Sequence, residues 1–143
     1  MTILAYTDGA SRGNPGESGI GIVLKDEWGN VIASHYGYIG KATNNVAEYT
    51  ALAACLSLVQ KTECSRLVVH SDSELMVRQL NGEYKVKDAV LKKHVQRIQK
   101  MMRASSFQCN INHVPREKNQ EADKLANRGI DTKQTLKHVD KSL

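Results

Sequence analysis

Two aspartates follow short apolar runs that are typical of buried strands. Asp8 comes directly after residues 3–7, and Asp72 comes shortly after residues 67–69. A buried carboxylate without a partner is costly, so each must be solvated, hydrogen-bonded or held beside a cation. The carboxyl ends of parallel strands are also where open α/β sheets place their ligand sites. The two positions therefore predict a shared site, although Asp72 alone could equally be a helix N-cap.

Two further acidic residues fall on predicted helices. Glu48 shares a helical stripe with Ala51, Leu52 and Cys55, so it should point toward the sheet and away from solvent. The helix dipole explains a glutamate in a first turn but does not explain this direction. Asp123 lies in the last predicted helix and is expected to face the same sheet edge, although on its own it would be a solvated helical aspartate.

Together the four carboxylates predict a metal centre. If they converge on one edge, they repel one another strongly unless cations lie between them. A site made of oxygen ligands suits Mg²⁺, with Mn²⁺ as a substitute. Four carboxylates can hold two such ions about 4 Å apart, an arrangement that hydrolyses phosphodiesters. We expect Asp8 to be a ligand that bridges both ions.

The pattern of the chain predicts the elements that hold these residues. After Asp8, the glycines of residues 9–16 and the pair Asn14-Pro15 indicate a loop that a polymer backbone can approach. Two β-rich runs then flank a turn at residues 27–30. Helices are expected at residues 45–61, 88–103 and 119–128, the last of them ending at Gly129. Ser71 and Glu74 have the spacing of a capping box, which predicts another helix that runs to Leu80. Strands are expected at residues 67–69 and 107–113. This order predicts an α/β fold with a mixed sheet and helices on both faces.

Composition narrows the class of protein. The 143 residues suit one domain, and we expect residues 130–143 to be a loosely ordered tail. The net charge is +5, and residues 85–103 carry seven basic residues against one acidic residue, which indicates either a polyanion-binding face or a solvated helix. Three cysteines without paired spacing favour a reducing compartment. With no apolar run of about 18 residues, we expect a protein of the cytoplasm, or of an organelle, that does not bind membranes. We also expect a monomer.

Four segments of the chain resemble the motifs of type 1 ribonuclease H. They are "TDGASRGNPG", "TNNVAEYTAL", "VVHSDSELMVRQL" and "HVPREKNQEADKLA", and the resemblance spans residues 1–129. It implies a catalytic domain over these residues, built on a five-stranded mixed sheet in the order 3-2-1-4-5. It also implies an endoribonuclease that cuts the RNA strand of RNA/DNA hybrids by two-metal catalysis and leaves 5′-phosphate and 3′-hydroxyl ends.

The same resemblance assigns roles to individual residues. Asp8, Glu48, Asp72 and Asp123 match the metal-binding catalytic set. Further matches concern the substrate. Asn14, Asn44 and Asn45 match positions that read the minor groove, and Lys41 and Thr43 match a pocket for a DNA-strand phosphate. The matches for contacts with RNA 2′-hydroxyls are Glu48 and the backbone around Gly9, Ala10, Ser11 and Glu74. A lysine in place of an arginine at position 41 keeps the charge but loses the bidentate geometry.

Some features depart from the family pattern. Relatives with a long basic loop place tryptophans after the second helix, whereas residues 81–88 are brief. Lys85, Lys87 and the helix that follows, with Lys92, Lys93 and Arg97, are therefore expected to help hold the substrate. No hybrid-binding domain is expected before Met1. His113 matches a histidine that helps the product leave, but it could equally be an ordinary strand residue, and Arg116 is the competing candidate.

Two alternatives to a ribonuclease H remain at this point. The first is another nuclease of the same fold, of the resolvase or integrase type. The second is a non-catalytic module that binds RNA/DNA hybrids, which would be expected to have lost at least one of the four carboxylates.

Overall fold

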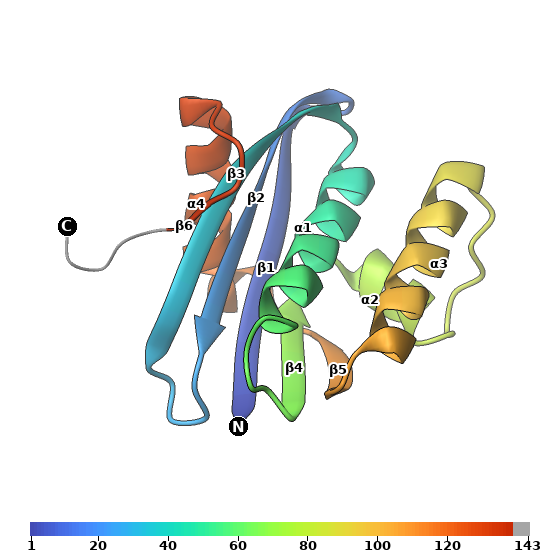
Figure 1. Cartoon of the computed structure of the whole chain (residues 1–143). Helices are drawn as coiled ribbons and strands as arrows, with labels where there is room; N and C mark the ends of the chain where they lie inside the picture. Colours follow the sequence, from blue (N-terminus) through green and yellow to red (C-terminus); the bar gives the residue numbers. More distant parts are fainter. Residues whose placement is uncertain (139–143) are drawn as a thin grey trace.

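A mixed sheet forms the centre of the molecule (Figure 1) in the computed structural model, which describes residues 1–138. Its strands lie in the order β5-β4-β1-β2-β3-β6. The bounds are β1 (Thr2–Gly13), β2 (Gly16–Lys25), β3 (Val31–Ala42), β4 (Arg66–Ser71), β5 (Gln108–His113) and β6 (Lys137–His138). The first three are antiparallel neighbours, and β4 and β5 run parallel to β1. The five longer strands thus have the predicted order 3-2-1-4-5, and the short β6 pairs with β3.

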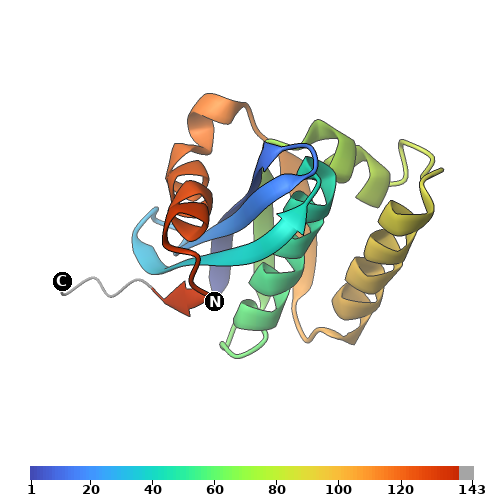
Figure 2. The same ribbon diagram turned by 90° about the horizontal axis from the view of Figure 1, so that it is seen from above.

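Helices cover both faces of the sheet, as predicted. They are α1 (Asn44–Val59), α2 (Glu74–Leu80), α3 (Ala89–Ala104) and α4 (Gln120–Thr132), with a short 3₁₀ helix at Arg116–Lys118. Figure 2 shows α4 on one face and α1 on the other, with α3 packed beyond α1. The main apolar core lies between the sheet and α1, and includes Ile3, Leu52 and Leu67. Within residues 1–138, no helix combines the length and apolar character needed to cross a membrane.

The segment after Asp8 is a strand, so the prediction of a loop there was wrong. β1 continues to Gly13 and pairs with β2 from Leu4 to Gly13, and the chain reverses tightly between Gly13 and Gly16. Gly9 serves a different purpose from the one expected. A Cβ at this position would lie 2.2 Å from the carbonyl carbon of Ala47, so the glycine lets α1 cross directly over β1.

The last helix is longer than predicted. α4 continues to Thr132 and ends at Lys133, which has a left-handed φ of 53°. Gly129 does not end the helix but allows close packing. A Cβ at this position would lie 2.3 Å from the carbonyl oxygen of Gly37, so the lack of a side chain lets α4 pack directly on β3. The expected domain boundary at residue 129 therefore falls inside α4, and Ile130 is buried. The rest of the predicted tail, residues 139–143, lies outside the described residues.

The start of α2 also differs from the predicted capping box. Ser73 is the N-cap, and its hydroxyl accepts a hydrogen bond from the N–H of Met76 at 3.3 Å. The hydroxyl of Ser71 instead accepts from the N–H of Ser73. Asp72 therefore does not cap α2, so capping does not explain an aspartate at this position.

Candidate active site

Asp8 and Asp72 occupy corresponding places beside the two central parallel strands. The last paired residues of β1 and β4 are Thr7 and Ser71, and each aspartate is the next residue along its chain. Asp8 remains in β1, opposite Gly21 of β2, and is only 5% exposed. The parallel register therefore places the two carboxylates at one end of β4, as the sequence predicted.

Glu48 reaches the same place from α1. Its side chain is 7% exposed and accepts a hydrogen bond at Oε1 from the backbone N–H of Gly9 at 2.7 Å. The inward direction predicted from its helical stripe is therefore correct. Thr43 caps this helix by accepting a hydrogen bond from the N–H of Val46, which fixes the start of the helix that carries Glu48.

Three carboxylates form a tight cluster at this point. Asp8, Glu48 and Asp72 each offer an oxygen, and these atoms all lie within 4.8 Å of one another. The cluster lines a cavity of about 440 Å³ together with Asp123, which α4 supplies from the other face of the sheet. Asp123 thus lines the same cavity but is not one of the three carboxylates whose oxygens lie within 4.8 Å of one another. Asn127 donates to Oδ1 of Asp123 at 3.3 Å and restrains its side chain.

The electrostatics of the cluster favour a cation. Burial, followed by the charges of Glu48, Asp72 and Asp123, raises the pKa of Asp8 far above that of an ordinary aspartate. Burial also raises the pKa of Glu48, an effect that the N–H of Gly9 partly opposes and the charge of Asp72 reinforces. Arg116 lines the cavity, and its positive charge favours ionised Glu48. The protein itself therefore supplies too little positive charge to neutralise these carboxylates.

Asparagines and backbone groups form one wall of the acidic cavity. The wall consists of Gly9, Ala10, Ser11, Asn44 and Asn45. Asn44 accepts a hydrogen bond at Oδ1 from the N–H of Ser11, and its own N–H donates to Oδ1 of Asn14, both at 3.1 Å. These bonds join the tip of the β1–β2 hairpin to the start of α1. The sequence predicted these residues at the site, and the structure brings them together.

A second cavity of about 280 Å³ adjoins the first. Asn14, Thr43 and Asn45 line it, together with Asp88 and residues of the first turn of α3. Asn45 lines both cavities. Lys41, predicted beside Thr43, is an exposed residue of β3 and does not line this cavity.

Two other predicted residues lie away from the acidic cavity. Glu74 is exposed and forms an ion pair with Arg78 at 2.8 Å. His113 ends β5, pairs in register with Ser71 and is exposed, and it is not a lining residue of the acidic cavity. Of the two candidates for assisting product release, only Arg116 lines this cavity.

The basic residues of α3 do not share one face. Lys92 lines an open groove of about 620 Å³ with Lys85 and Lys87. Lys93 and Arg97 are exposed but lie outside the lining of this groove. The helical period separates them from Lys92, because positions four apart share a face and adjacent positions do not.

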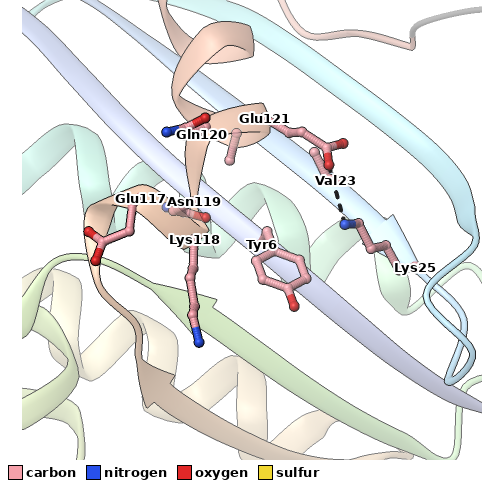
Figure 3. Close-up of a pocket in the computed structure, with 9 residues that line it drawn as sticks. Tyr6, Val23, Lys25, Glu117, Lys118, Asn119, Gln120 and Glu121 are labelled. Carbon is pink, nitrogen blue, oxygen red and sulfur yellow. Dashed lines mark hydrogen bonds and ion pairs between the residues drawn. The ribbon is translucent and has the colours of Figure 1, made fainter.

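Asn119 is a site residue whose contacts the sequence did not reveal. It is 1% exposed, and its side chain donates to the carbonyl of Thr7 at 2.9 Å and to Oδ2 of Asp72 at 3.4 Å. Figure 3 shows it in the wall of another cavity, of about 190 Å³, beside Tyr6 and the ion pair of Lys25 with Glu121. An asparagine directly before a helix is typical of an N-cap, and that pattern gave no sign of a contact with Asp72.

Comparisons with known proteins agree with this geometry. Residues 6–129 match the family model described as "Reverse transcriptase-like". Ribonuclease HI of Halobacterium salinarum is 39% identical over 127 residues, which are 89% of this chain and 63% of that protein. Ribonuclease H of Methylococcus capsulatus is 30% identical over 91% of this chain and 90% of its own length. The crystal structure of LC11-RNase H1 in complex with an RNA/DNA hybrid is 45% identical, covers 91% of this chain and 97% of that one, and has a TM-score of 0.87.

A mixed sheet in this order, with carboxylates gathered at the ends of its central parallel strands, defines the ribonuclease H class of α/β proteins. The chain belongs to the ribonuclease H family. Both the predicted family and the predicted fold are thereby confirmed. The chain spans 63% of the length of the Halobacterium relative.

Proposed function

We propose that the protein is an endoribonuclease that hydrolyses the RNA strand of RNA/DNA hybrids and leaves 5′-phosphate and 3′-hydroxyl ends. The observation that carries this proposal is the cluster of three carboxylate oxygens within 4.8 Å in a cavity walled by asparagines. A non-catalytic binding module has no need of buried carboxylates that repel one another. The hybrid bound to LC11-RNase H1 supports the same class of substrate.

The donor set fits a hard divalent cation. Asp8, Glu48 and Asp72, with Asp123, would hold Mg²⁺, or Mn²⁺ in its place, because all the donors are oxygens. When bound, such ions activate a water molecule and stabilise the leaving oxygen of a phosphodiester. The raised pKa values of Asp8 and Glu48 fit this role, since a nearby cation would offset the burial and repulsion that raise them.

The groups around the cluster would position the substrate. Asn44 and Asn45 would face the minor groove of the hybrid, and the backbone of Ala10 and Ser11 would approach the RNA 2′-hydroxyls. The adjoining cavity, with Asn14 and Thr43, would receive a phosphate of the DNA strand. Asp88 in its lining would weaken that contact, since a carboxylate repels phosphate.

Product release and the binding of more distant parts of the hybrid involve residues around the carboxylate cluster and beyond it. Arg116 would contact the substrate or product beside Glu48, whereas His113 would have to reach the site from the exposed end of β5. The groove with Lys85, Lys87 and Lys92 would hold a more distant part of the hybrid.

We also infer that the protein acts as a monomer in the cytoplasm. The proposed metal ligands and the residues proposed to position the substrate beside them all belong to one chain, so the proposed chemistry needs no residue of a second copy. Cys55, Cys64 and Cys109 are free thiols, which favours a reducing compartment.

The decisive experiment compares labelled RNA/DNA, RNA/RNA and DNA/DNA duplexes with Mg²⁺ and with Mn²⁺. We expect cleavage of the RNA strand of the hybrid, loss of cleavage after chelation, and 5′-phosphate ends on the products. Binding of the hybrid without cleavage under every metal condition would favour the non-catalytic module. Cleavage of the DNA duplex would favour a nuclease of the resolvase or integrase type.

A further inference from the structure

Asn119 is buried although the residues on both sides of it are exposed. It is 1% exposed, whereas Lys118 and Gln120 face solvent. It lies directly before α4, the place where an asparagine side chain ordinarily caps the helix. Its side chain makes no capping hydrogen bond. The usual reason for an asparagine at this position is therefore absent.

The amide instead turns toward the acidic cluster. Nδ2 donates to the carbonyl of Thr7 and also lies 3.4 Å from Oδ2 of Asp72. Among the described residues, Oδ1 of Asn119 has no hydrogen-bond partner. A side chain that forgoes a cap and leaves a buried acceptor unpaired is held there at a cost in stability. Such a cost indicates a functional requirement.

Asn119 connects three elements that each carry an acidic residue. The carbonyl it binds belongs to Thr7, the residue before Asp8. Its second contact is with Asp72, and its own carbonyl accepts the N–H of Asp123 at 3.1 Å. One buried residue thus links β1, the β4–α2 connection and α4 at the point where their carboxylates meet.

We propose that Asn119 is a positioning residue that orients the carboxylate of Asp72 for binding a divalent cation. The inference rests on the proposed function, since it assumes that the cluster binds a cation. A hydrogen bond to one oxygen restricts rotation of the carboxylate, so the ligand is held in a fixed orientation before the cation arrives. Residues that hold metal ligands in this way typically contribute 10–100-fold, as an order-of-magnitude estimate, to metal affinity or activity.

The test uses Asn119→Ala and Asn119→Leu, the second of which keeps a similar size but lacks a donor. Calorimetric titration of the metal-free proteins with Mn²⁺ measures affinity without any substrate. We expect affinity to fall by about 10–100-fold in both variants. In hybrid cleavage, we expect kcat at a fixed Mg²⁺ concentration to fall while KM changes little, because the phosphate contacts remain.

Asn81→Ala is the matched control. The Asn81 side chain also donates from Nδ2 to a strand carbonyl, that of Ile111 at 3.2 Å, and it lies outside the acidic cavity. This variant should lose some stability and keep wild-type Mn²⁺ affinity. Unchanged Mn²⁺ affinity in both Asn119 variants would overturn the proposal and leave Asn119 a purely structural residue.

A measurement on the unaltered chain covers the case in which the Asn119 variants do not fold. The side-chain amide resonances of Asn119 should shift during an Mg²⁺ titration followed by NMR, while those of Asn81 should not. An Asn119 signal that ignores Mg²⁺ at saturation would also overturn the proposal. Failure of the unaltered chain to cleave hybrids would contradict the proposed function, yet both metal titrations would still report on Asn119.

Discussion

The backbone N–H of Gly9 donates a hydrogen bond to Oε1 of Glu48 at 2.7 Å, although the two residues are 39 positions apart. This bond joins β1 to the first turns of α1 and exists only because the two backbones nearly touch. A Cβ on Gly9 would lie 2.4 Å from the N of Glu48 itself. The position of a central carboxylate thus depends on the absence of a side chain on another element.

Gly9→Ala should displace α1 from β1 and move Glu48 out of the cluster. We expect a loss of about 1–3 kcal/mol in the free energy of unfolding, because backbone atoms cannot yield as a flexible side chain can. Hybrid cleavage should fall by more than the smaller fraction of folded protein would account for. Urea unfolding and a single-turnover cleavage assay measure the two effects.

Gly29→Ala provides the control for that change. Nothing lies within 4 Å of an added Cβ at this turn, although the φ of 87° makes alanine unfavourable there. This variant should lose some stability and cleave normally. If Gly9→Ala behaved in the same way, the close crossing of α1 over β1 would not matter for the site.

Asp8→Asn should abolish cleavage while stabilising the metal-free protein at neutral pH. The native pKa of Asp8 is raised, so between the ordinary value of 3.8 and the raised value the folded protein keeps a proton that the unfolded chain has lost. Stability of the metal-free wild type should therefore fall as pH rises through this range. The asparagine removes that dependence, and we expect a gain of about 1 kcal/mol or more at pH near 8.

Urea unfolding in the presence of a chelator, at acidic and at mildly alkaline pH, checks this prediction. The gain should shrink toward acidic pH, where the wild-type carboxyl is protonated in both states. A gain that is equal at both pH values would show that the pKa of Asp8, raised by burial and by the neighbouring carboxylates, is not its source. Added Mg²⁺ should stabilise the wild type more than the variant, because the variant has one ligand fewer.

The basic groove should contribute to affinity and not to the chemical step. Replacing Lys85, Lys87 and Lys92 by glutamine should weaken hybrid binding and reduce its salt dependence by a slope of about 0.9 for each phosphate that the protein no longer neutralises. Single-turnover cleavage at saturating enzyme should change little, because phosphate contacts outside the cluster only position the substrate. Binding measured over a range of salt concentrations gives the slope.

Lys93→Gln combined with Arg97→Gln is the comparison for the groove variant. These residues lie on α3 but outside the groove, so their loss should reduce the salt slope less. An equal reduction per charge would mean that the whole helix, and not the groove, contacts the hybrid. An unchanged slope in both variants would show that α3 faces solvent and does not contact the hybrid.

Asn45→Ala should lower the rate of hybrid cleavage far more than it lowers binding. Asn45 lines both cavities, so its loss should misalign the ribose without removing the phosphate contacts. A hybrid with one 2′-deoxy sugar at the cleavage step should slow the wild type but slow the variant little further. A double-mutant cycle of enzyme and substrate measures this coupling. Simple additivity would assign the choice of RNA to Glu48 and the backbone of β1 instead.

The sequence by itself determined the resemblance to the family and the direction of Glu48. The first depends on short motifs and the second on local periodicity, and both can be seen in one chain. The order of the five longer strands was predicted only through the resemblance. The positions of Asp8 and Asp72 were also predictable, because parallel strands bring their carboxyl ends to one edge. The acidic residues could therefore be named before their distances were known.

Only the tertiary structure decided what the glycines and Asn119 do. The local sequence predicts a loop at Gly9 and a helix end at Gly129. In the structure, Gly9 allows α1 to touch the backbone of β1, and Gly129 allows α4 to touch the backbone of β3. Asn119 has the local appearance of a cap, but its amide binds Thr7 and Asp72. Such contacts join residues far apart in the chain, and a local pattern cannot report them, because packing outweighs intrinsic preference at these positions.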